Sequence, residues 1–196
     1  MNIEFEIHIT TSDLSEEEVR SFKVFCKSIN AKPILIELSK GKQHRQPMIS
    51  KVVKCNTKSE LEKELNWLKN QFEMNDYTIT RTKIEIPPWQ RANAENYYVG
   101  QTEKYYEWHC KVDVDDEELV NNICSIYNGR LSKNRLKNEE NRKFITMRES
   151  DNETLIGTRI KNLKENLKQN GITIYKEELE YCIYDSNKSL DNGWID

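Results

Sequence analysis

The amino-acid sequence predicts an α+β fold made of two tandem βαββαβ units with antiparallel sheets, related by an internal duplication. Three observations lead to this prediction. Segments of period two and of period 3.6 follow one another in the same order in both halves of the chain. Polar residues typical of helix starts precede the helical segments. Chemically equivalent side chains recur at matching positions of the two halves, as expected for a repeat.

The first half is predicted to hold strands and helices in the order βαββαβ. Residues Ile3–Thr10 alternate apolar and polar side chains, which is typical of a half-buried strand. Ser15 and Glu18 can form a capping box at the start of a helix that ends near Ile29. The other elements expected in this half are the strands Pro33–Leu38 and Met48–Cys55, a helix that starts after Thr57, and the strand Tyr77–Ile86.

The same order is expected again after a linker that contains Tyr97 and Tyr98. Gly171 can end the last helix as a left-handed cap. The elements expected in the second half are the strands Tyr105–Val112, Arg130–Leu136, Arg142–Glu149 and Ile172–Tyr184, with helices that start near Asp115 and Asn152. We therefore predict a first unit at residues 1–88, a linker at 89–104, a second unit at 105–185 and a C-terminal tail at 186–196.

Single residues repeat as well as whole elements. The segment FEIHI at Phe5–Ile9 aligns with YEWHC at Tyr106–Cys110, so the pair Glu-x-His recurs. The βαββαβ order resembles the ferredoxin-like motif and the bacterial proteins built from two fused units of that kind. The FEIHITT start and the EYCIYDSN end also resemble one bacterial family, and this resemblance bears on the fold and implies no particular activity.

The sheet faces that such units leave open are expected to carry the functional groups. In ferredoxin-like units the helices cover one face of the sheet, so the resemblance implies that the other face is free. On the first strand that face holds Glu4, Glu6, His8 and Thr10. Isolated charges are costly in a dry core. We therefore expect this face to contact water, or the two sheets to curve around a polar cavity.

The sequence predicts a protein that binds a small anionic ligand in a polar cleft between the two units. Glu-x-His occurs once in each unit, and residues i and i+2 of a strand point to the same side, so each carboxylate can orient its imidazole. We therefore select His8 and His109 as candidate catalytic acid/base groups. The residues expected to bind the ligand are Glu6, Thr10, Arg81, Glu85, Glu107, Lys111, Arg148, Lys176 and Glu180.

An enzymatic alternative is hydrolysis of a phosphodiester by the two histidines. The segment HIT at residues 8–10 is similar to the H-x-T/S motif that 2H phosphoesterases carry once per lobe. The segment HCK at residues 109–111 departs from it, with Lys in place of the hydroxyl residue. The resemblance implies that one histidine acts as general base and the other as general acid. The segment EFEIH at residues 4–8 is also similar to the E-x-E-x-K start of the triphosphate tunnel fold, with His where Lys is expected.

A metal site and a scaffold role are further alternatives. The two histidines and their paired glutamates could bind a divalent transition ion if both pairs met at one ion. Sequence spacing does not predict that meeting, so we assign no metal ligands and no cofactor. A basic cluster could bind phosphate or an acidic partner, and is more typical of a charged sheet edge; its members are Lys133, Arg135, Arg142, Lys143 and Arg148. The scaffold alternative uses the open faces or edges to bind a protein.

Composition limits the partners and the compartment. The 196 residues carry a net charge of −3, which does not favour nucleic-acid binding. No apolar run approaches the roughly 18 residues that span a bilayer, and Met1–Thr11 lacks the pattern of a signal peptide. The five cysteines are widely spaced, without metal or redox motifs. We expect a cytoplasmic protein without a membrane partner, and no feature predicts an oligomeric state.

Overall fold

The computed structural model describes residues 2–41, 43–94, 97, 102–137, 139 and 141–195. The first half contains β1 (Ile3–Thr11), α1 (Glu16–Ser28), β2 (Lys32–Leu38), β3 (Arg45–Cys55), α2 (Lys58–Met74) and β4 (Ile79–Ile86), followed by a 3₁₀ helix at Pro88–Gln90 and α3 (Arg91–Ala94). The second half contains β5 (Tyr105–Asp113), α4 (Glu117–Ile126), β6 (Arg130–Asn134), β7 (Arg142–Ser150), α5 (Glu153–Gln169), β8 (Ile174–Asp185) and a 3₁₀ helix at Lys188–Asp191. None of the helices in these ranges is long and apolar enough to cross a lipid bilayer.

Local signals in the sequence place the ends of several elements. The capping box predicted at Ser15 is confirmed, because its hydroxyl accepts a hydrogen bond from the Glu18 N–H while the Glu18 carboxylate accepts one from the Ser15 N–H. Gly171 follows α5 with a φ of +74°, a conformation that favours glycine. The third strand begins at Arg45 rather than at Met48, because its first residues pair with β2.

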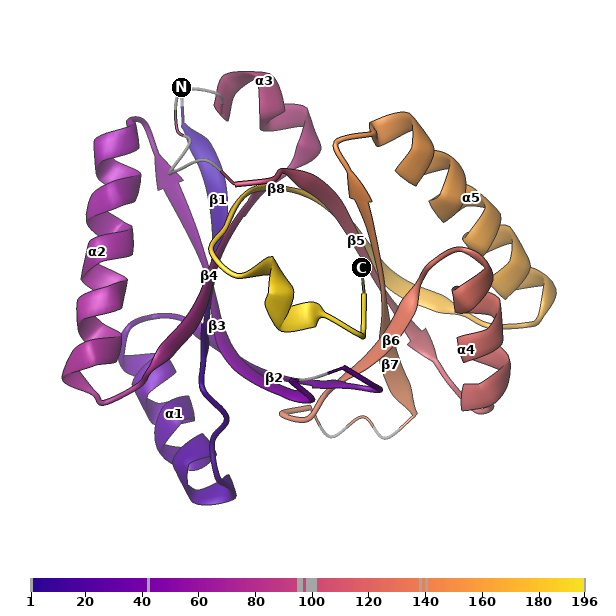
Figure 1. Ribbon diagram of the computed structural model, residues 1–196, viewed down its shortest axis with the longest axis horizontal. Helices are drawn as coiled ribbons and strands as arrows, with labels where there is room; N and C mark the ends of the chain where they lie inside the picture. Colours follow the sequence, from indigo (N-terminus) through magenta and orange to yellow (C-terminus); the bar gives the residue numbers. More distant parts are fainter. Residues whose placement is uncertain are drawn as a thin grey trace.

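The strands of the described chain form one closed barrel in the order β1-β3-β2-β6-β7-β5-β8-β4 (Figure 1). Antiparallel pairing of β2 with β6 and of β4 with β8 joins the two halves of the chain at two places. The prediction of two tandem ferredoxin-like units, each with its own antiparallel sheet, is therefore wrong. Closure gives a partner to every strand that would otherwise be an exposed edge. The periodicity of a strand does not show which strand pairs with it, so the sequence pattern could not reveal this closure.

Helices cover the outside of the barrel, and the main apolar core lies between them and the strands (Figure 1). One face of β1 contributes Phe5 and Ile7, both fully buried. The rings of Phe25 and Phe72 pack edge to face beneath α1 and α2, with their centroids 5.2 Å apart. Because the apolar side of each strand faces the helices, the alternate polar side chains are directed into the barrel.

The C-terminal segment lies across one end of the barrel, inside the ring of strands in Figure 1. Trp194 and Ile195 pack against Leu38 in a second small apolar cluster. The Trp194 indole N–H donates to the Leu131 carbonyl at 3.1 Å. A side chain at Gly41 would place its Cβ 3.2 Å from the Cβ of Trp194, so glycine permits this close approach. The tail is therefore an integral part of the fold.

The predicted linker contains buried and undescribed residues. Tyr97 is buried, its ring packs on Phe5 at 5.3 Å, and its hydroxyl donates to the Asn56 carbonyl. Tyr98 and residues 95, 96 and 99–101 lie outside the described residues. The predicted boundaries at residues 1–88, 89–104, 105–185 and 186–196 stay a prediction.

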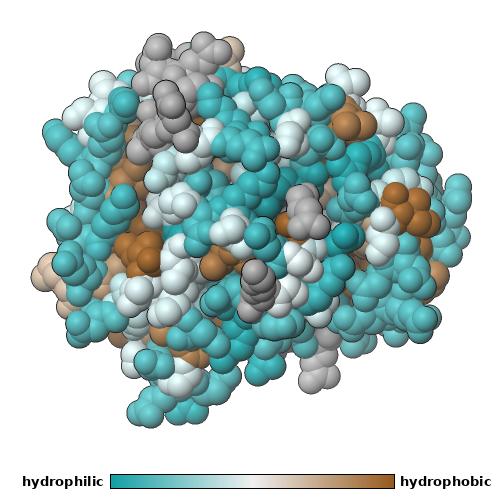
Figure 2. Space-filling view, in the orientation of Figure 1, coloured by the Kyte–Doolittle hydropathy of each residue, from teal (hydrophilic) through white to brown (hydrophobic). Residues whose placement is uncertain are grey.

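The surface seen in Figure 2 is mostly hydrophilic. Apolar side chains appear there in small separate groups, which is normal for a folded protein. This face therefore offers no broad apolar patch, and the search for a site turns to the polar interior.

Substitutions of a buried and of an exposed tryptophan test the packing of the tail. Trp194 is 6% exposed, whereas Trp89 is 72% exposed. We expect Trp194→Ala to lower the free energy of unfolding by about 3–5 kcal/mol, as for other buried aromatic residues. Trp89→Ala is the control and should change it by less than about 1 kcal/mol. Urea denaturation followed by circular dichroism measures both, and equal effects would contradict the integral role of the tail.

Candidate functional site

Charged side chains from five strands line the interior of the barrel. They are Glu6 and His8 of β1, Lys83 and Glu85 of β4, Glu107 and His109 of β5, Arg148 of β7, and Glu180 of β8. The antiparallel registers bring them together. His8 lies opposite Lys83 on β4, and Glu107 lies opposite both Arg148 and Glu180 on its two neighbouring strands.

A chain of ionic contacts joins the two histidines selected from the sequence. His8 Nε2 is 3.0 Å from Glu85 Oε2, and Lys83 Nζ is 2.9 Å from Glu85 Oε1. On the other side, Lys83 Nζ is 2.7 Å from Glu107 Oε1, which is 3.0 Å from His109 Nε2. Both imidazoles therefore belong to one connected cluster inside the barrel, and Lys83 is the cation at its centre.

The pKa shifts at the centre of this cluster favour the charged forms of its side chains. Burial alone would lower the pKa of Lys83, but the carboxylates of Glu107 and Glu85 outweigh it, so the pKa is raised above its usual value. Burial would raise the pKa of Glu107, and the charges of Lys83 and Arg148 instead lower it well below its usual range. Because removal of one partner from a buried pair leaves an uncompensated charge, these residues stabilise the fold only as a set.

A second buried network fastens the tail to the barrel wall. The Asp185 carboxylate accepts hydrogen bonds from Arg81 at 2.9 and 2.6 Å and from the Tyr105 hydroxyl at 2.7 Å. Asp191 Oδ2 accepts from Arg81 Nη1 at 2.9 Å and from Arg148 Nη2 at 2.7 Å. The tail thus supplies one carboxylate to two buried guanidinium groups.

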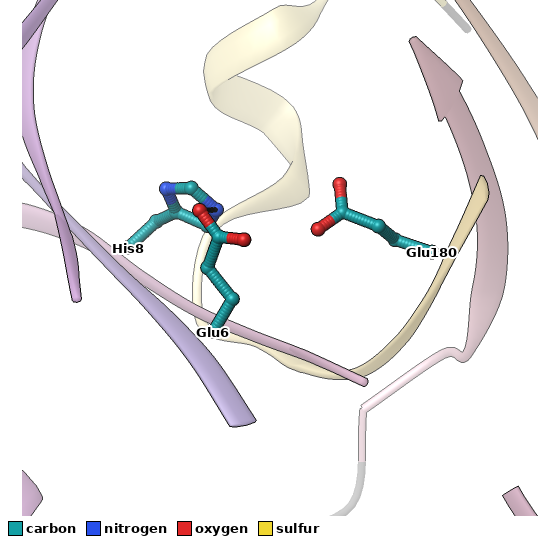
Figure 3. Close-up of side chains that lie close together, drawn as sticks. All are labelled: Glu6, His8 and Glu180. Carbon is teal, nitrogen blue, oxygen red and sulfur yellow. Dashed lines mark ion pairs between the residues drawn. The ribbon is translucent and has the colours of Figure 1, made fainter. Parts of the chain in front are cut away.

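One side of the interior is acidic. Glu6, His8 and Glu180 direct their polar atoms toward one another (Figure 3), and one ligand atom from each lies within 4.8 Å of the others. Glu6 Oε1 is 3.5 Å from His8 Nε2 and also accepts a hydrogen bond from the Ser50 hydroxyl at 2.6 Å. Burial, together with the charges of Glu85 and Glu6, raises the pKa of Glu180 well above its usual value.

A basic pocket of about 400 Å³ opens beside the tail. Its lining residues are Asn128, Arg130, Arg148, Glu149, Ser150, Arg159, Lys188 and Ile195. Four of these side chains are cationic and one, Glu149, is a carboxylate. The lining therefore holds more cations than carboxylates, although Lys188 also pairs with Glu103, outside the lining, at 2.9 Å.

Two of these arginines, Arg148 and Arg130, have guanidinium N–H groups that no described residue accepts. Arg148 uses Nε and Nη2 to bind Glu107, while its Nη1 is buried without a hydrogen-bond partner among the described residues. Arg130 donates to the carbonyls of Trp194 and Gly129, which leaves its charge without a described carboxylate within 4 Å. Unlike them, Arg159 binds the Glu149 carboxylate at 2.6 Å.

The remaining residues selected from the sequence are spread along the barrel. Thr10 is buried opposite Arg81. Lys111 Nζ pairs with Glu139 at 2.5 Å, and Lys176 Nζ pairs with Glu178 at 2.9 Å. These two lysines therefore make ion pairs of their own, outside the chain of contacts that joins the histidines.

The sequence analysis did not select the residues that line the basic pocket beside Arg148 or that bind Arg81. They are Arg130, Arg159, Lys188, Asp185 and Asp191. Lys188 and Asp191 lie in the segment predicted as a C-terminal tail, and Arg159 lies on the helix predicted to start near Asn152. Asp185 is out of phase with Glu178 and Glu180, and a register shift between β4 and β8 places it opposite Lys83, so the alternation gave no signal for it.

Comparisons with known proteins do not assign a family. No protein-family model matches the chain, and no curated protein matches it in sequence. Among solved structures, a proposed monooxygenase from Fusobacterium nucleatum is similar at 11% identity and a TM-score of 0.36, with 95% of each chain covered. The small subunit of acetolactate synthase from Thermotoga maritima has 9% identity and a TM-score of 0.34, over 91% of this chain and 95% of the other.

A variant of chlorite dismutase from Candidatus Nitrospira defluvii is similar at 11% identity and a TM-score of 0.33. The match covers 96% of this chain and 94% of the other. At such TM-scores these similarities carry no inference about the activity of this chain.

The Arg81–Asp185 pair makes a prediction about acid stability. Burial would raise the pKa of Asp185, but hydrogen bonds from Arg81 lower it below its usual value. A lowered pKa contributes stability above the unfolded value of about 3.9, and this contribution is lost as the pH falls through the folded value. We expect Asp185→Asn to lose roughly 3 kcal/mol at pH 7 and to lose less additional stability than wild type between pH 5 and the acid transition.

Urea denaturation at a series of pH values measures this difference. Asp76→Asn, at an exposed position, is the control and should follow the wild-type profile. Parallel acid profiles for wild type and Asp185→Asn would contradict the assigned role of this pair.

Proposed function

We propose that this protein binds a small anionic ligand in the basic pocket beside the C-terminal tail. The observation that carries the proposal is Arg148, a lining residue of the pocket whose buried Nη1 has no described hydrogen-bond partner. A buried donor without a partner is costly in free energy, and an anion that accepts its hydrogen bond removes that cost.

The charges around the pocket support an anion over a neutral ligand. Four cations and one carboxylate line the pocket. Arg148, Arg159 and Lys188 have carboxylate partners, whereas Arg130 has none within 4 Å among the described residues. Guanidinium groups present planar pairs of donors that match carboxylate and phosphate oxygens. A volume of about 400 Å³ suits a small molecule.

The binding of Asp191 shows that a carboxylate fits this neighbourhood. Its Oδ2 atom lies 2.7 Å from Arg148 Nη2, on the same guanidinium whose Nη1 is free. Arg130 donates from Nε to the Trp194 carbonyl of the same tail at 2.7 Å. The tail therefore fixes the positions of both arginines for a ligand.

The other expectations from the sequence stay predictions beside this proposal. His8 and His109 each direct Nε2 at a carboxylate 3.0 Å away, which orients both imidazoles but does not favour phosphodiester hydrolysis over binding. The scaffold alternative also stays a prediction. A cytoplasmic location is part of the proposal, and the five free cysteines are compatible with a reducing compartment.

Calorimetric titration of the full-length chain with pyrophosphate, in the presence of EDTA, tests the proposal. We expect wild type to bind, and Arg130→Gln to bind about tenfold more weakly, because a hydrogen bond to a charged group contributes about 1.5–3 kcal/mol. Arg135→Gln is the matched control, since Arg135 pairs with Glu37 away from the pocket.

Two outcomes would overturn the proposal. One is the absence of heat and of any thermal shift with pyrophosphate, phosphate and citrate at millimolar concentrations. The other is an equal loss of affinity in Arg130→Gln and Arg135→Gln, which would show only a general effect of net charge.

A further inference from the structure

We infer that Glu6, His8 and Glu180 form a binding site for one divalent transition-metal ion, such as Zn²⁺ or Mn²⁺. The site is separate from the basic pocket and does not rest on the function proposed there. Two strands supply it: β1 carries Glu6 and His8 at i and i+2, and β8 carries Glu180. Residues at i and i+2 on a strand share a face, so the pair is held in place by the barrel wall.

The spacing of the Glu6 and His8 ligand atoms suits a metal ion, and Glu180 lies close to both. One ligand atom from each residue lies within 4.8 Å of the other two, and Glu6 Oε1 is 3.5 Å from His8 Nε2. Two ligands about 2.1 Å from one ion at a tetrahedral angle are about 3.4 Å apart. Figure 3 shows the carboxylate of Glu180 directed across the interior toward the other two side chains.

The charge around this set is incompletely balanced. Among the described residues, no Lys or Arg nitrogen lies within 4 Å of the Glu6 or Glu180 carboxylate, whose only ion pairs are with histidines. Glu85 lies beside them, 3.0 Å from His8 Nε2, and is fully buried. Its other oxygen, Oε1, is 2.9 Å from Lys83 Nζ. Its ammonium partner, Lys83, is shared with Glu107.

An added cation would neutralise this excess. The fully buried carboxylate of Glu85 lies beside the same His8 nitrogen and shares its ammonium partner with Glu107, which is a second observation that points to a positive ligand. Of the carboxylates of Glu6, Glu85 and Glu180, only that of Glu85 contacts an ammonium group among the described residues. Buried charges are tolerated when they are paired or bind metals.

The ligand types select the kind of ion. One imidazole with carboxylate oxygens suits Zn²⁺ or Mn²⁺, whereas Ca²⁺ and Mg²⁺ prefer oxygen ligands alone. An ion can reach the site from solvent, because the side chains of Glu6, His8 and Glu180 are 27%, 13% and 12% exposed.

Isothermal titration calorimetry tests this site on the untagged, full-length chain after removal of metals with EDTA. We expect wild type to bind one Zn²⁺ per chain, with little heat from Mg²⁺. Glu180→Gln keeps the shape of the side chain and removes a ligand charge. It should weaken Zn²⁺ binding by at least about tenfold, the lower bound seen when residues that only support a ligand are lost.

Glu6→Gln is a second variant with the same expected result, and circular dichroism confirms that each variant is folded. Glu177→Gln is the matched control, because it lies on the same strand while its carboxylate contacts Lys164 and Trp108 instead. Binding of Zn²⁺ should also raise the unfolding temperature of wild type and of this control more than that of Glu180→Gln.

The inference is overturned if wild type binds neither Zn²⁺ nor Mn²⁺. It is equally overturned if Glu6→Gln and Glu180→Gln bind Zn²⁺ as tightly as Glu177→Gln does, since the ion would then lie elsewhere, for example at His44.

Discussion

Closure of the barrel is the constraint on which the rest of the structure depends. Once β2 pairs with β6 and β4 pairs with β8, every second side chain of the strands is enclosed. The helices cover the apolar side, so the enclosed side chains are the polar ones. Charges in such a space must be paired, because an isolated buried ion is costly. The chain from His8 through Lys83 to His109 and the network around Arg81 both follow from this requirement.

The C-terminal tail completes that pairing at one end of the barrel. Arg81 and Arg148 come from strands of different halves, and Asp191 gives them a shared carboxylate. Trp194 covers the same end with apolar surface and also fixes Arg130 through its carbonyl. The tail therefore acts both as a counter-ion and as a cover, and two of its residues, Lys188 and Ile195, line the basic pocket.

Much of the local structure could be predicted from the sequence. Alternation in Ile3–Thr10 identifies both the first strand and its polar face, and the Ser15 capping box places the start of α1. The same alternation selected Glu6, His8, Glu107 and His109, which the barrel does bring into one connected interior. These successes share a cause: each depends on residues close together along the chain, where backbone geometry alone sets the direction of a side chain.

The remaining features depend on contacts between segments far apart in the chain. Pairing of β2 with β6 is encoded in no local period, so an open sheet and a closed barrel have the same sequence pattern. Arg130, Arg159 and Lys188 come from a strand, a helix and the tail, and only the closed barrel brings them to one pocket.

The distribution of charge could not be predicted from the sequence either. The net charge of −3 conceals an interior in which the cations gather toward Arg148, while Glu6 and Glu180 are left without a Lys or Arg partner among the described residues. Because electrostatic free energy depends on distance and burial rather than on composition, this separation of charge within one barrel becomes visible only when the strands are closed around it.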